Sequence, residues 1–106
     1  MKNKEDFLKI LREIYNKPNT SQRELANTLK FSLGKLNYCL KSLQGKGLLK
    51  IKNFKKSKKK INYIYLLTPK GITQKTKLTI NFLKRRMNEY DQLKQDLKNE
   101  ENKHKL

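Results

Sequence analysis

Two capped helices separated by only two residues constrain the fold of this chain most strongly. Ser21 and Glu24 form a capping box, S-x-x-E, in which each side chain satisfies a free backbone N–H at the start of a helix. Ser32 is a good N-cap for the next helix. Only Lys30-Phe31 lies between the two, so one of these residues must adopt a left-handed conformation without the help of a glycine. Two short helices joined so tightly are typical of a helix-turn-helix.

The second of these helices has two unlike faces. Leucines recur on one face at i, i+4 and i+7 (Leu36, Leu40, Leu43) and form an apolar stripe that faces the core. The opposite face breaks two local rules, because Gly34 costs about 1 kcal/mol relative to alanine and Lys35 places a cation in a first turn that favours an anion. Conflicts of this kind tend to mark functional sites. The residues on or beside this face are Gly34, Lys35, Asn37, Tyr38, Lys41 and Ser42.

A lysine-rich hairpin is expected directly after this helix. Gly45-Lys46-Gly47 ends the helix, and residues 48–51 are predicted to form a strand. A second strand is expected over residues 61–67, which are rich in β-branched and aromatic side chains. Seven of the eleven residues from 50 to 60 are lysine. A solvated flexible loop is the alternative, but folding requires no such repulsion at a hairpin tip, whereas neutralising phosphate does. We therefore predict a wing over residues 48–67.

The charge of the chain is strongly positive and unevenly distributed. Lys and Arg total 27 against 9 Asp and Glu, which gives a net charge of +18. Such an excess favours a polyanionic partner, either nucleic acid or an anionic membrane surface. A coding bias toward lysine and asparagine is an alternative source, since only four of the 27 cations are arginine. A general bias does not explain why the interval between Glu24 and Glu89 holds 17 Lys or Arg and no carboxylate.

The last expected element is a long helix over residues 69–101, followed by a frayed tail over residues 102–106. Thr68 is its expected N-cap and Pro69 its first residue. A helix of roughly 30 residues spans ~45 Å, more than the preceding domain can cover, so its distal half needs a partner. A second copy in a two-fold homodimer is the simplest partner, and burial against the domain alone is the alternative. The residues spaced for a coiled-coil-like dimerisation seam are Ile80, Leu83, Met87, Tyr90, Leu93 and Leu97.

These elements predict a mainly α fold with a small β-hairpin wing, in the α+β class. Residues 1–68 are expected to form a winged helix-turn-helix domain, with its second helix over about 21–29 and its recognition helix over about 32–45. A first helix runs to about Tyr15 and ends before Pro18, which cannot continue the hydrogen-bond ladder. The long C-terminal helix follows this domain.

The sequence lacks the groups of residues that catalysis or metal binding would require. The central segment has no carboxylate for a general base, Cys39 has no histidine near it in sequence, and the sole histidine, His104, lies in the expected tail. No Cys/His cluster and no Gly-rich phosphate loop occurs. We therefore predict no enzymatic activity, no cofactor and no metal site. Cys39 is predicted to be a small core residue, with a redox switch as the alternative.

The sequence also bears on the compartment. A single cysteine excludes an internal disulfide and is compatible with a reducing cytosol. There is no run of ~18 apolar residues that could span a bilayer, and no signal-peptide apolar core follows the basic start. We expect a soluble cytoplasmic protein without a membrane partner.

Four segments of the chain are distinctive in combination: SQRELA, SLGKLNYCLKSL, GLLKIKNFKKSKKK and YLLTPKGI. Over residues 20–86 the chain resembles winged helix-turn-helix regulators of the MarR (multiple antibiotic resistance regulator) family. The segments are similar to its EPS-associated subgroup, whose members tend to lie beside exopolysaccharide biosynthesis genes. The resemblance implies a dimeric transcription regulator with a winged domain and a terminal helical dimerisation segment. Members of the wider family often bind small phenolic effectors in a cleft near the dimer interface, but this chain is shorter, so we carry over neither effector binding nor a drug-resistance role.

The residues and the resemblance together predict sequence-specific binding of double-stranded DNA by a homodimer, with a palindromic operator as its target. In the major groove Lys35 would favour guanine and Asn37 adenine, while the wing lysines would line the backbone or the minor groove. The start of the second helix would touch phosphate. The expected DNA-binding residues are Gln22, Arg23, Ser32, Gly34, Lys35, Asn37, Tyr38, Lys41 and Ser42, with Lys55, Lys56, Lys58, Lys59 and Lys60 in the wing.

Two other functions stay open at this point. The same fold, driven by charge alone, would coat DNA without specificity or associate with RNA. Alternatively, the long helix would act as an adaptor that forms a coiled coil with a different protein. A specificity ratio near one favours the first alternative, and a monomer that pairs only with its partner favours the second.

Overall fold

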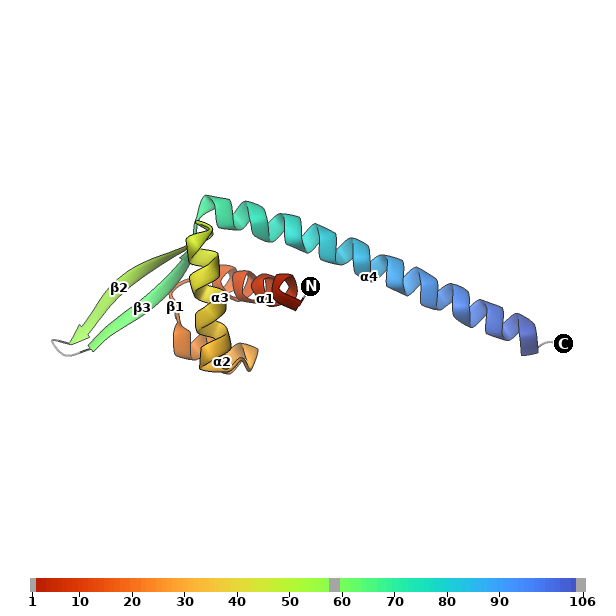
Figure 1. Cartoon of the computed structure of the whole chain (residues 1–106), viewed down its shortest axis with the longest axis horizontal. Helices are drawn as coiled ribbons and strands as arrows, with labels where there is room; N and C mark the ends of the chain where they lie inside the picture. The colour runs from red at the N-terminus through yellow and green to blue at the C-terminus, as the bar shows by residue number, and fades with distance from the viewer. Residues whose placement is uncertain (1, 58–59, 105–106) are drawn as a thin grey trace. The chain divides into compact units, whose positions relative to one another are not determined.

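The computed structural model is mostly helical, with one small antiparallel sheet (Figure 1). It describes residues 2–57 and 60–104, and the side chains of residues 4–52 and 63–104. The expected α+β class, with a wing and a long C-terminal helix, is confirmed. The elements in chain order are α1 (Lys2–Asn16), β1 (Thr20–Ser21), α2 (Gln22–Leu29), α3 (Leu33–Gly45), β2 (Leu49–Ser57), β3 (Lys60–Leu67) and α4 (Pro69–His104).

Both predicted helix caps are present in the helix-turn-helix. The Ser21 hydroxyl accepts a hydrogen bond from the backbone N–H of Glu24 at 3.2 Å. In the same way, the Ser32 hydroxyl accepts from the backbone N–H of Lys35 at 3.1 Å. Lys30 ends α2 in the left-handed conformation, with φ of 57°. The turn therefore forms without glycine, at the conformational cost that its sequence predicts.

The core forms where α1, α2 and α3 meet. The leucine stripe of α3 is almost completely buried, with Leu36, Leu40 and Leu43 no more than 2 % exposed. Leu25 of α2 is likewise buried. Burying one such side chain contributes about 2 kcal/mol, so this packing fixes which face of α3 points outward. The α1 residues that complete this core include Ile10, Leu11 and Ile14.

The sheet has three strands rather than the two of the expected hairpin. Its order is β1-β3-β2, and both strand pairs are antiparallel. In β1, Thr20 pairs with Tyr65 and Ser21 with Ile64. Thr20 is 3 % exposed, and its hydroxyl donates to the Glu24 carboxylate at 3.4 Å. A strand of two polar residues has no period-2 pattern, so the sequence carried no signal for it. Beyond β1, β2 and β3 continue as a two-stranded ribbon (Figure 1).

The start of α4 is fastened to the turn between α3 and β2. The Thr68 hydroxyl donates to the carbonyl of Gly47 at 2.6 Å and accepts from the backbone N–H of Gly71 at 3.0 Å. The backbone N–H of Thr68 donates to the carbonyl of Leu48 at 3.1 Å. A Cβ added at Gly71 would overlap this same carbonyl oxygen. Thr68 thus caps α4, as predicted, and also ties it to the preceding turn.

The chain divides into two compact units, Met1–Thr76 and Lys77–Leu106. The first unit extends beyond the expected boundary at residue 68, because the first turns of α4 pack against it through the buried Gly71. The second unit is the remainder of α4, which continues to His104 rather than ending near residue 101. Lys103 lies in its last turn, where a cation complements the helix dipole.

Candidate nucleic-acid interface

The outer face of α3 is exposed along its whole length. Tyr38 is 62 % exposed, and Gly34, Asn37 and Lys41 are also exposed. The buried residues of α3, which include the leucine stripe, lie on the opposite side of the helix. The face is therefore free to contact a partner.

Gly34 has no role in the internal packing of the domain. A Cβ placed on it meets no atom within 4 Å, and its φ is not positive. Neither space nor backbone conformation therefore requires glycine at this position. Glycine lowers helix stability here, so an advantage of the missing side chain would have to come from what approaches α3 from outside.

Lys35 leans toward α1 rather than straight outward. Its amine lies 3.2 Å from the Asp6 carboxylate and 4.3 Å from the centre of the Phe31 ring. Its side chain is 47 % exposed, whereas that of Asp6 is 14 % exposed. Lys35 is therefore accessible but held by two partners, and a contact with a DNA base would require it to leave Asp6.

The structure adds Leu33 to the exposed face of α3. Leu33 is the first residue of the helix and is 62 % exposed. It lies three residues before Leu36, a spacing that on its own would place it at the edge of the buried stripe. Sequence reasoning missed it for that reason. On the helix surface it neighbours Asn37, four residues later.

The remaining candidates around α3 differ in exposure. Arg23 is exposed at the start of α2, and Gln22 beside it is half-buried. Ser32 is exposed, although its oxygen already accepts the capping bond from Lys35. Ser42 is half-buried. Ser42 is thus the least accessible of the candidates on α3.

Two lysines of β2 lie on the same face of the sheet. Lys50 and Lys52 of β2 are exposed and pair in register with Leu66 and Ile64 of β3. The alternate residues of β2 and β3, which include Tyr65 at 6 % exposed, turn to the other face. Lys55, Lys56 and Lys60 lie within the strands, but their side chains are outside the described part of the chain. Lys58 and Lys59 lie outside the described residues altogether.

Cys39 is buried in α3, as predicted, at 2 % exposed. Burial raises the pKa of its thiol, the Asp6 carboxylate raises that pKa further, and Lys35 opposes both. The thiol is therefore held protonated and shielded from solvent, which does not suit a reactive cysteine.

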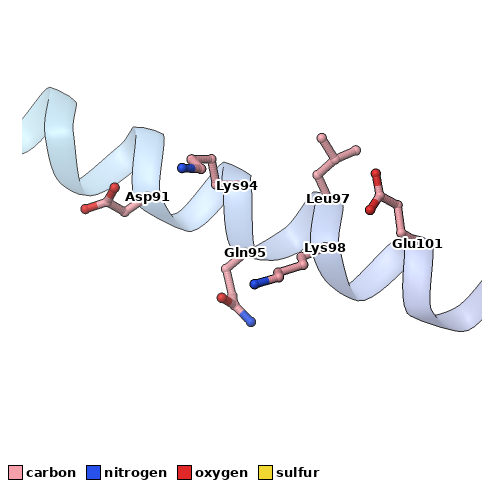
Figure 2. Close-up of a pocket in the computed structure, with 6 residues that line it drawn as sticks. All are labelled: Asp91, Lys94, Gln95, Leu97, Lys98 and Glu101. Carbon is pink, nitrogen blue, oxygen red and sulfur yellow. The ribbon is translucent and has the colours of Figure 1, made fainter.

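Three other features bear on the kinds of site that the described part of the chain can form. Within residues 2–57 and 60–104, no three His, Cys, Asp or Glu side chains gather as metal ligands. Among those residues no helix has the length and hydropathy to cross a bilayer. A surface hollow on α4 is lined by Asp91, Lys94, Gln95, Leu97, Lys98 and Glu101, all from one helix (Figure 2). Leu97 and Glu101 project from one side and Gln95 from the other (Figure 2), so these side chains do not enclose a ligand.

A family model described as winged helix-turn-helix DNA-binding matches residues 8–50. The matched stretch includes α2, α3 and most of α1. No curated protein sequence is significantly similar to the chain.

Solved structures of regulators share the fold. The transcriptional repressor CouR bound to a 23-mer DNA duplex is 22 % identical with a TM-score of 0.70, over 81 % of this chain and 59 % of that one. MepR of S. aureus in a DNA complex is 19 % identical with a TM-score of 0.65, over 83 % and 63 %. MarR of Staphylococcus aureus, in complex with salicylate and kanamycin, is 21 % identical with a TM-score of 0.64, over 82 % and 57 %. The chain thus has the winged helix-turn-helix fold of MarR-type regulators and spans less than two thirds of their length.

Proposed function

We propose that this protein is a transcription regulator that binds double-stranded DNA sequence-specifically as a homodimer. The observation that carries the proposal is the exposed outer face of α3, which lies in a stretch of 64 residues between Glu24 and Glu89 that lacks any carboxylate. The same fold appears in CouR and MepR, which are seen bound to DNA. A chain segment with many cations and no anions favours contact with the phosphate backbone.

The proposed contacts follow the geometry of a helix-turn-helix. The N-terminal half of α3 enters the major groove, where such helices present their side chains to base edges. Asn37 then pairs with adenine, and Lys35, after leaving Asp6, with guanine. Tyr38, Lys41 and Ser42 reach bases or phosphates, and Gln22, Arg23 and Ser32 contact phosphates. The wing lysines lie along the backbone or the minor groove, where they add affinity more than specificity because lysine lacks the planar fork of arginine.

Dimerisation through α4 completes the proposal. The six predicted seam residues, Ile80 to Leu97, are all exposed in the single chain, from 47 % to 67 %. An apolar stripe of this length on a soluble surface marks an interaction site. A second copy related by a two-fold axis would cover it and would present two α3 helices to a palindromic operator.

The experiment compares binding to a selected site with binding to random DNA. A duplex chosen by the wild-type protein from a random library, and a scrambled duplex of equal length, are titrated in the same salt. We expect the selected duplex to bind at least about 1,000-fold more tightly. The double variant Lys35→Ala, Tyr38→Ala should lose affinity for the selected duplex more than for the scrambled one. Equal affinities for the two duplexes would instead support a protein that coats DNA or associates with RNA through charge alone.

The targets are proposed on the sequence resemblance to the EPS-associated subgroup. The candidate target genes are those beside its own gene, including exopolysaccharide biosynthesis genes. The protein would act in the cytoplasm. Footprinting on the DNA upstream of its own gene tests this assignment directly. Protection confined to unrelated promoters would remove it while leaving DNA binding in place.

A further inference from the structure

Leu33 is an apolar side chain in a place where folding does not need one. It is the first residue of α3 and is 62 % exposed, although its neighbours on the leucine stripe are buried. Exposing a leucine forgoes the roughly 2 kcal/mol that burial would contribute. A single exposed leucine is common on protein surfaces, so its meaning depends on what surrounds it.

The residues around Leu33 suit the edge of an A·T base pair. Asn37, also exposed, lies one helical turn further along the same side of α3. An asparagine amide pairs with adenine, and apolar side chains contact the 5-methyl group of thymine, which only the major groove displays. Four residues of helix advance by ~6 Å and base pairs by ~3.4 Å, so the two side chains reach bases one or two steps apart.

The one cation in the first two turns of α3 is directed elsewhere. Lys35, whose preference would be guanine, has its amine 3.2 Å from Asp6 and over the Phe31 ring. Gly34, beside Leu33, meets no atom within 4 Å of a built Cβ. It therefore leaves room for DNA to approach Leu33 closely.

We propose that Leu33 is a specificity-determining residue that contacts a thymine methyl group, so that each half-site carries A·T pairs beneath the start of α3. This inference rests on the proposed function, because it requires α3 to lie in the major groove. It assigns the apolar contact to Leu33 and the adjacent adenine to Asn37, and neither contact depends on whether Lys35 leaves Asp6.

The test removes only the 5-methyl group of thymine from the DNA. In the duplex selected from a random library, each thymine is replaced in turn by deoxyuridine, which keeps its base pairing. For the wild-type protein we expect one such replacement in each half-site to weaken binding about fourfold, the value of one buried methyl group. In Leu33→Ala the same replacement should have no effect. Ile72→Ala, which shortens an aliphatic side chain that is 42 % exposed on α4, is the matched control and should keep the wild-type pattern.

The possible outcomes distinguish a failure of the role proposed for Leu33 from a failure of the proposed sequence-specific DNA binding. A deoxyuridine penalty that is absent in the wild-type protein, or that persists unchanged in Leu33→Ala, overturns the role of Leu33 while leaving specific binding intact. A selection that yields no preferred sequence overturns the proposed function, and the role of Leu33 with it. The wild-type measurement uses the unaltered protein, and a Leu33→Ala variant that failed to fold would not bind the duplex, so a folding defect cannot produce any of these results.

Discussion

At Gly34, the residue that would best stabilise the fold differs from the residue that the proposed DNA contact favours. A methyl group at this position meets no atom within 4 Å, so Gly34→Ala should raise the free energy of unfolding by about 0.5–1 kcal/mol through better helix propensity. The same methyl group would be trapped against DNA in the proposed complex, and we expect affinity for the selected duplex to fall about tenfold. Urea unfolding and a binding titration measure the two effects. A variant that gains stability and keeps its affinity would show that Gly34 does not lie against DNA.

The ion pair between Asp6 and Lys35 gives a second prediction at a single position. Asp6→Asn removes the carboxylate 3.2 Å from the lysine amine, and the change in stability should stay below about 1 kcal/mol because the lysine is half exposed. Releasing Lys35 should raise affinity for DNA. In a Lys35→Ala background Asp6→Asn should have no such effect, which a double-mutant cycle measures. An equal gain in both backgrounds would mean that Asp6 acts only through the total charge.

At the level of elements, the junction between α4 and the turn after α3 should tolerate no side chain at Gly71. A Cβ there overlaps the carbonyl oxygen of Leu48, which already accepts a hydrogen bond from Thr68. We expect Gly71→Ala to lower the free energy of unfolding by about 2 kcal/mol. Gly45→Ala is the control, since its Cβ would have no neighbour within 4 Å. Equal stability of the two variants would contradict the tight packing at this junction.

The contribution of the wing to DNA binding should be visible in the salt dependence of the binding constant. Replacing Lys55, Lys56 and Lys60 by alanine should flatten the dependence of the logarithm of the binding constant on the logarithm of salt concentration, by about 0.9 for each phosphate that the variant no longer neutralises. The control replaces Lys94, Lys98 and Lys103 of α4 by alanine, which removes the same charge from a different element. Equal slopes for the two triple variants would remove the wing from the DNA interface.

The elements that the sequence predicted best are those fixed by local chemistry. The serine caps of α2 and α3, the left-handed Lys30 and the buried leucine stripe all follow from neighbours within a few residues. Strand β1 and the closeness of Gly71 to Leu48 depend on residues tens of positions apart in the chain. No periodicity signals such contacts.

The candidate site shows the same division between local and distant causes. The outward direction of Asn37, Tyr38 and Lys41 follows from helical geometry once the stripe is known. The hold of Asp6 on Lys35 could not be predicted, because it joins α1 to α3. The exposure of Leu33 depends on where the core ends, which its spacing from Leu36 does not fix.

For the whole molecule, the central prediction is the oligomeric state. Light scattering should give twice the 12.7 kDa mass of the chain. Leu83→Asp combined with Leu93→Asp places charges in the proposed seam, and should return the mass to that of one chain and weaken binding to a palindromic duplex by at least about 100-fold. Asn81→Asp with Gln92→Asp, at exposed polar positions of the same helix, is the matched control. A wild-type monomer that pairs only with another protein would support the adaptor alternative.

The clamp that Thr68 makes on Gly47 and Leu48 has an evolutionary consequence. Thr68 stands at the start of α4, the helix that carries the proposed seam further along. In the proposed dimer, the pairing of the two α4 helices sets the distance between the two half-sites of the operator. The side chains of α3 select the bases within each half-site. In evolution, substitutions in α4 alone could therefore change the spacing of the half-sites, and substitutions in α3 alone could change their base sequence.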